Sequence, residues 1–156
     1  MELTIKEVSF WFLDRGSEEG KILTKDKLES FLFLSYAWYL AVKGTEMYDV
    51  TFFATEEYPK IDRFERLYHN FFAEYAKAKK PLTPLDDFSE SFLEKIWDKY
   101  DFFSDDELHI LTNSEYTPNQ KTYFNNFNSI TEIPTELIRN FYIQRLQGLK
   151  NFSFTD

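Results

Sequence analysis

The stretch Leu28–Val42, LESFLFLSYAWYLAV, decides the fold of this chain. Twelve of its 15 residues are apolar or aromatic, and no single helical stripe accommodates them all. A helix that is apolar on every side is either a membrane span or the central rod of a globular core. Fifteen residues at about 1.5 Å each are too short for a bilayer, which needs roughly 20 apolar residues. The stretch therefore predicts a buried central helix over residues 25–43, capped by Thr24 and closed by Gly44.

Composition places the chain in one mainly helical domain. Of the 156 residues, 43% are hydrophobic and 20% aromatic, which excludes a disordered chain and provides enough apolar surface for a core. Four glycines and five prolines are too few for an all-β protein, which uses both residues in its turns. We predict a mainly α fold with a small β hairpin, as a single helical domain over residues 1–150. Residues 151–156 are predicted to form a loose C-terminal tail.

Apolar periodicity and capping signals predict five further helices packed around the central one, which gives a compact bundle of about six. The first begins after Thr4, which forms a capping box with Glu7, and Gly16 is expected to end it. The other start signals are two N-cap serines and a proline at a first helical position: Ser89, Ser104 and Pro134. The predicted ranges are 5–15, 61–78, 89–100, 104–112 and 134–148.

Two stretches lack helical periodicity. Residues 47–54 are β-branched and aromatic, which predicts a short extended segment, and residues 113–129 predict a long polar loop with one helical turn near residues 123–127. Irregular segments on a rigid scaffold are common places for recognition. Partner contacts are therefore assigned to the stretches around Pro59 and after Thr112, at Phe53, Tyr58, Pro59, Thr112, Asn113 and Tyr116.

Charge and cysteine content narrow the function classes. The net charge is −9, from 18 basic and 27 acidic residues, which opposes direct binding to nucleic acid or anionic membranes. It permits a basic protein partner, although solubility alone also accounts for it. With no cysteine, disulfides, thiolate nucleophiles and cysteine-based metal sites are excluded. The N-terminus has no signal-peptide pattern, so a cytoplasmic protein is expected.

The sequence offers no catalytic constellation, so neither an enzyme nor a cofactor is expected. His69 and His109 have no metal-binding spacing, and no serine lies in a nucleophile motif. Two acidic runs, at residues 86–87 and 105–107, are explained by helix starts, where the helix dipole favours negative charge. An enzyme would require a pocket that gathers Tyr100, Glu107 and His109. What remains is an excess of aromatic residues, typical either of an interaction module or simply of a large aromatic core.

The order of segments resembles the Panacea domain, the SocA-like antitoxin family. The likeness lies in an apolar run at Val8–Leu13, the connector Gly20–Leu28 and the helix Phe33–Leu40, FLSYAWYL. In the family's F-x-A-W-x-x-G-P-V motif, Ala54 and Pro59 match, while Thr55, Tyr58 and Lys60 replace Trp, Gly and Val.

A second family motif, Y-G-x-x-S-x-x-E-L-x-x-L-T-H, is matched in part by the segment Tyr100–Asn113, which keeps its Ser, Glu-Leu and Leu-Thr spacing but lacks the Gly and the closing His. The family's last helix corresponds to Pro134–Leu149, and Pro118 lies near its Pro-Trp. The resemblance thus spans nearly the whole chain as a divergent member.

The resemblance implies an antitoxin-type binding protein. Such proteins neutralise a toxin by direct complex formation or deliver it to a protease, and several are phage-associated. The alternative is a phage or mobile-element inhibitor of a host defence nuclease, with an acidic surface that imitates DNA. A DNA mimic needs carboxylates in rows on one face, whereas the sequence places its acidic residues mainly at helix starts.

Overall fold

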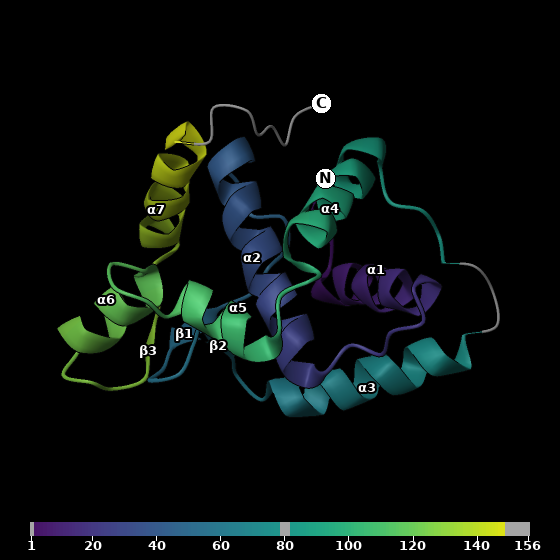
Figure 1. Ribbon diagram of the computed structural model, residues 1–156, viewed down its shortest axis with the longest axis horizontal. Coiled ribbons are helices and arrows are strands. Elements are labelled where there is room, and N and C mark those ends of the chain that lie inside the picture. The colour runs from purple at the N-terminus through teal and green to yellow at the C-terminus, as the bar shows by residue number, and fades with distance from the viewer. Residues whose placement is uncertain (1, 79–81, 149–156) are drawn as a thin grey trace.

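The computed structural model describes residues 2–78 and 82–148, and within them it has seven helices and a three-stranded sheet (Figure 1). The mainly α fold with a small β element is confirmed. The predicted tail lies outside the described residues. The elements in chain order are α1 (Ile5–Glu18), α2 (Lys25–Lys43), β1 (Phe52–Ala54), β2 (Lys60–Ile61), α3 (Phe64–Lys77), α4 (Asp87–Tyr100), α5 (Asp105–Thr112), α6 (Pro118–Asn125), β3 (Thr131–Glu132) and α7 (Thr135–Gly148).

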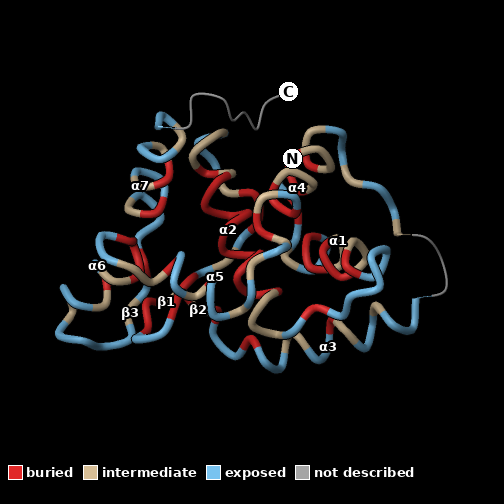
Figure 2. Tube along the Cα trace, viewed as in Figure 1, coloured by how far each residue is buried: buried red, intermediate tan, exposed pale blue. Residues whose placement is uncertain are grey.

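Helix α2 runs through the centre of the molecule, as its sequence predicts. Every residue from Leu28 to Trp38 is buried, and Figure 2 shows this rod among the other elements. It packs against α1, α3, α4, α5 and α7. Thr24 caps it by accepting a hydrogen bond from the backbone N–H of Lys27, and Gly44 ends it in the left-handed conformation. Both predicted ends are confirmed.

Aromatic rings fill the space between α2 and its neighbours. Phe31 is stacked between Phe12 of α1 and Trp97 of α4, with ring centroids 4.9 and 5.2 Å apart. The indole N–H of Trp38 donates to the hydroxyl of Tyr100 over 2.7 Å. The polar atoms of these two buried rings thus satisfy each other inside the core, as burial of Trp and Tyr requires.

The sheet has the order β2-β1-β3 and both pairings are antiparallel. In β1, Phe53 pairs with Lys60 on one side and with Glu132 on the other. The predicted extended segment at 47–54 is therefore correct only for its last three residues. The first residues of the predicted segment lie beside the N-terminal residues instead, because the backbone N–H of Leu3 donates to the carbonyl of Met47 over 2.9 Å.

Three predicted helix ends are wrong. Gly16 does not end α1 but lies inside it. The glycine allows the following loop to pass closely, since a Cβ at this position would lie 3.3 Å from the Lys21 carbonyl oxygen. Asp86, not Ser89, caps α4, since its carboxylate accepts from both the backbone N–H and the hydroxyl of Ser89 at 3.0 and 2.7 Å. Helix α3 begins at Phe64 because the preceding residues form β2.

The predicted loop at 113–129 contains a full helix, α6. Thr117 caps it and Pro118 occupies its first turn, the combination that favours a helix start. The Asn- and Thr-rich composition of the stretch concealed this signal. Helix α6 packs against β1, so it connects the sheet to the rest of the chain.

Candidate functional site: a two-loop surface over a buried polar network

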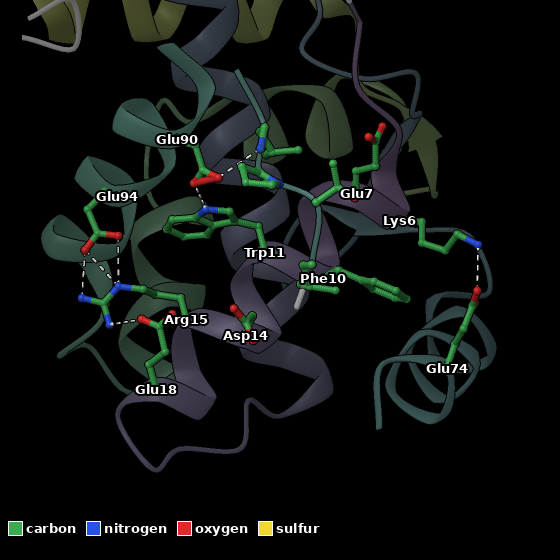
Figure 3. Close-up of a pocket in the computed structure, with 14 residues that line it drawn as sticks. Lys6, Glu7, Phe10, Trp11, Asp14, Arg15, Glu18, Glu74, Glu90 and Glu94 are labelled. Atoms are coloured by element: carbon green, nitrogen blue, oxygen red, sulfur yellow. Dashed lines mark hydrogen bonds and ion pairs between the residues drawn. The ribbon is translucent and has the colours of Figure 1, made fainter. Parts of the chain in front are cut away.

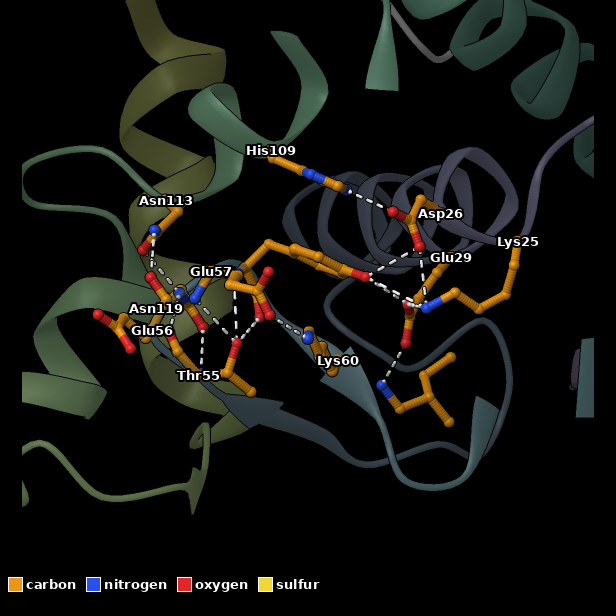
Figure 4. A network of polar contacts seen from close by, with 12 residues as sticks. Lys25, Asp26, Glu29, Thr55, Glu56, Glu57, Lys60, His109, Asn113 and Asn119 are labelled. Atoms are coloured by element: carbon orange, nitrogen blue, oxygen red, sulfur yellow. Dashed lines mark hydrogen bonds and ion pairs between the residues drawn. The ribbon is translucent and has the colours of Figure 1, made fainter. Parts of the chain in front are cut away.

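The two stretches predicted to contact a partner lie against each other. The side chain of Asn119, fully buried in α6, accepts from the backbone N–H of Thr55 over 3.1 Å and donates to its carbonyl over 3.0 Å. It also donates to Asn113, whose own amide donates to the Glu56 carbonyl over 2.9 Å. These bonds join residues 55–60 and 112–117, hereafter the two-loop surface (Figure 4).

The six predicted contact residues occupy different depths at this surface. Tyr58, Pro59 and Thr112 are buried, Phe53 and Asn113 are half-buried, and Tyr116 is 67% exposed. The buried members shape the surface from below. Three carboxylates on the same two loops are also exposed, although the sequence pattern did not indicate them: Glu56, Glu57 and Glu115.

Tyr116 is held in an unusual backbone conformation. Its φ of 73° lies in the left-handed region, which residues with a side chain rarely adopt. The loop around it is fixed, because Thr117 donates through both its N–H and its hydroxyl to the Ser114 carbonyl, at 3.1 and 2.7 Å. Strained residues of this kind concentrate at binding sites. The result is an exposed aromatic ring on a backbone that hydrogen bonds hold in place.

A polar network lies beneath the loop at 55–60. The Tyr58 hydroxyl lies within hydrogen-bond distance of Asp26 and Glu29 on α2, at 3.1 and 3.2 Å (Figure 4). Glu29, only 1% exposed, also accepts from the backbone N–H of Ile61 in β2 over 2.8 Å. The ammonium group of Lys25 approaches the same carboxylate to 3.7 Å. Helix α2 and β2 are therefore connected through one buried carboxylate.

Burial governs the electrostatics of this network. It raises the pKa of the Glu29 carboxyl, because desolvation outweighs the hydrogen bond from Ile61 and the charge of Lys25. It also raises the pKa of the Tyr58 hydroxyl, which the nearby carboxylates of Glu29 and Asp26 raise further. The phenol therefore stays protonated and acts as a donor to the carboxylates.

The three residues named for a possible enzyme are engaged in separate contacts. His109 stacks on the ring of Tyr58, with centroids 3.9 Å apart and planes at 6°, and its Nε2 lies 3.9 Å from an Asp26 oxygen. Glu107 completes the capping box of α5 with Ser104. Tyr100 accepts from Trp38 in the core. Among the described residues, no three His, Asp or Glu side chains are placed to hold a metal ion together.

A second feature is an acidic cavity of about 510 Å³ between α1, α3, α4 and the segment before α4 (Figure 3). It is lined by Lys6 and Arg15 and by six carboxylates: Glu7, Asp14, Glu18, Glu74, Glu90 and Glu94. Arg15 hydrogen-bonds Glu94 at 2.9 Å, and Trp11 donates to Glu90 at 2.6 Å. The expectation that acidic residues cluster mainly at helix starts is wrong for this face, because Asp14 and Glu18 lie near the end of α1.

In residues 2–78 and 82–148, no helix is both long and apolar enough to cross a membrane. Comparisons of this chain with models of protein families, with curated proteins and with solved structures found no match.

Proposed function

We propose that this chain is a non-catalytic protein-binding module of the antitoxin type, which neutralises a toxin through the two-loop surface or delivers it to a protease. The observation that carries the proposal is Tyr116, an exposed aromatic ring on a strained but hydrogen-bonded loop. Rigid aromatic side chains dominate the binding energy of protein interfaces because they bury much area at little entropic cost.

The charges at this surface indicate the kind of toxin. Glu56, Glu57 and Glu115 are exposed on the same two loops as the ring, and the Lys60 ammonium is paired with Glu57 at 2.6 Å. A basic protein surface complements this arrangement, in agreement with the net charge of −9. The likeness to the Panacea family, which rests on sequence motifs, supports the antitoxin role.

Coexpression with the short gene next to the one that encodes this chain tests the proposal. We expect suppression of that gene's toxicity and a stoichiometric complex after copurification. Tyr116→Ala should weaken the complex about 30-fold, the value for a 2 kcal/mol hot spot. Phe127→Ala, at an even more exposed ring outside the two-loop surface, should leave the affinity unchanged. Absence of both rescue and complex would reject the proposal.

The acidic cavity favours a second candidate, an inhibitor of a host defence nuclease. Carboxylates from α1, α3 and α4 surround one cavity, which an arginine- or lysine-rich nucleic-acid site would fit electrostatically. For this function, the paired substitution Asp14→Asn and Glu18→Gln should abolish inhibition of a nuclease, and Tyr116→Ala should have no effect. The antitoxin proposal predicts the opposite pattern, so the two variants distinguish the candidates.

A further inference from the structure

A groove of about 860 Å³ lies on another part of the molecule, between α2, the end of α4, α5 and α7. Its walls are largely apolar and come from segments far apart in the chain: Leu34, Trp38, Tyr100, Phe102, Phe103, Leu111, Phe141 and Tyr142. The volume is within the range of sites that hold a small molecule or a few side chains of a peptide.

The rim of this groove exposes large apolar side chains. Phe102 is 73% exposed, although its ring lies 4.7 Å from that of Phe103, and Leu111 is 39% exposed. Inside the groove the rings of Trp38 and Tyr142 are buried and in contact, with centroids 5.1 Å apart. A rigid aromatic base below accessible apolar residues is the arrangement of a recognition groove.

The charges of the groove are opposite to those of the whole molecule. Among the described residues that line it, the ionisable cations are Lys99 and Arg145, and none is a carboxylate, in a chain of net charge −9. The Lys99 ammonium lies 5.6 Å from the centre of the Tyr100 ring, and the Arg145 guanidinium lies 4.8 Å from that of Phe141. Both cations thus face the apolar lining.

Two electrostatic effects agree with this placement. Burial lowers the pKa of the Lys99 ammonium, so its charge is only partly solvated. The positive charge of Arg145 acts on the hydroxyls of both Tyr100 and Tyr142, where it opposes the effect of burial on their pKa. A carboxylate bound here would interact with Arg145 in a partly desolvated environment, where charge pairs are stronger than at an open surface.

We propose that this groove binds a short segment of another protein that combines apolar side chains with carboxylates. Its apolar side chains pack on Phe102, Leu111 and Tyr142, and a carboxylate pairs with Arg145. The proposal goes beyond the two-loop surface, because it uses other residues and selects a partner segment of the opposite charge.

Peptide titration of the full-length ¹⁵N-labelled chain tests the inference. The probe is the capped hexapeptide Glu-Phe-Asp-Leu-Phe-Glu. Two control peptides of the same length accompany it: the lysine twin has lysines in place of the acidic residues, and the alanine twin has alanines in place of the apolar residues. The acidic apolar probe should shift the amide signals of residues in α5 and α7, and raised salt should weaken its binding because the charge pairs are partly exposed. Both twins should bind at least about tenfold more weakly.

Two pairs of exposed substitutions locate the site. Arg145→Glu should weaken binding about tenfold, whereas Arg139→Glu, on the same helix outside the groove, should not. Phe102→Ala should also weaken it about tenfold, with Phe124→Ala as the unaffected control. All four positions are exposed, so circular dichroism should confirm a fold unchanged from that of the original chain.

Three results would overturn the inference. The first is equal binding of the lysine twin, or signal shifts outside the groove. The second is binding seen only after the double substitution Phe152→Ala and Phe154→Ala, which would make the chain's own last residues the occupant. The third is a concentration-dependent dimer that Phe102→Ala dissociates, which would make the occupant a second copy.

Discussion

Removal of the Glu29 side chain should destabilise the fold strongly, because this one carboxylate connects α2 to β2. In Glu29→Ala, the buried backbone N–H of Ile61 loses its hydrogen-bond acceptor, and the Tyr58 hydroxyl loses one of its two carboxylate partners. An unsatisfied buried donor costs about 1–3 kcal/mol. A cavity adds to this cost, while the end of carboxylate desolvation offsets part of it. We expect a net loss of about 2–4 kcal/mol, or about 6–12 °C in Tm for a chain of this size.

A neutral isostere separates the hydrogen bonds from the charge. In Glu29→Gln, the amide oxygen can still accept from Ile61, and the amide N–H can donate to the Tyr58 oxygen while the phenol proton goes to Asp26. We expect its stability at pH 7 to lie within about 1 kcal/mol of the original chain. Glu132→Gln, at an exposed carboxylate, serves as the matched control.

The pH dependence has a definite sign. Because burial raises the pKa of Glu29 in the folded state, the folded chain binds a proton that the unfolded chain does not, in the window above the ordinary glutamate value. The stability of the original chain relative to Glu29→Gln should therefore rise as the pH falls through that window. Urea unfolding at pH 7 and pH 5, followed by circular dichroism, measures this difference. An unchanged difference, or an alanine variant as stable as the original chain, would refute the reasoning.

Three further substitutions have expected outcomes in urea unfolding. Asn119→Asp replaces two buried donors by a charge next to the Thr55 carbonyl and should cost about 2–4 kcal/mol, while the exposed Asn140→Asp should cost under about 0.5 kcal/mol. Phe31→Ala removes the middle ring of a stack and should cost about 3–5 kcal/mol; a smaller loss would mean that the neighbouring rings collapse into the space. Tyr116→Gly should stabilise the chain by up to about 1 kcal/mol, because glycine adopts a positive φ without strain, and yet weaken partner binding by at least about 30-fold.

The scaffold could be predicted because its signals are local. The apolar run of α2 and the caps at Thr4, Thr24 and Ser104 are contained in a few neighbouring residues. Two of the helix ends that were predicted wrongly depend on contacts that the pattern does not contain. Gly16 accommodates a loop that returns to α1, and β2 displaces the predicted start of α3. Tertiary contacts of this kind override local propensity.

The candidate site is less predictable, because long-range polar pairs build it. Asn119 contacts Thr55 across 64 positions, and nothing in the local sequence of either residue specifies the pair. Recognition near residues 58 and 113 stays a prediction, and what the structure shows is that the two segments adjoin. The burial of the predicted contact residues could not be predicted. The aromatic side chain of Tyr58, for example, could equally be a buried hydrogen-bond donor or an exposed anchor for a partner. Only Tyr116 combines the predicted location with an accessible ring.

The buried polar residues of α2 explain how so uniform a helix selects one arrangement of its neighbours. A rod that is apolar on every side can pack in many rotations about its axis, because dispersion and apolar burial have little directionality. Glu29 has specific partners in β2 and the 55–60 loop, and Ser35 donates to the Leu32 carbonyl near the Tyr48 hydroxyl. Any rotation would leave the Glu29 carboxylate buried without its donors, at a cost of several kcal/mol. The same carboxylate that is expensive to bury therefore fixes the sheet, and with it the 55–60 loop of the two-loop surface.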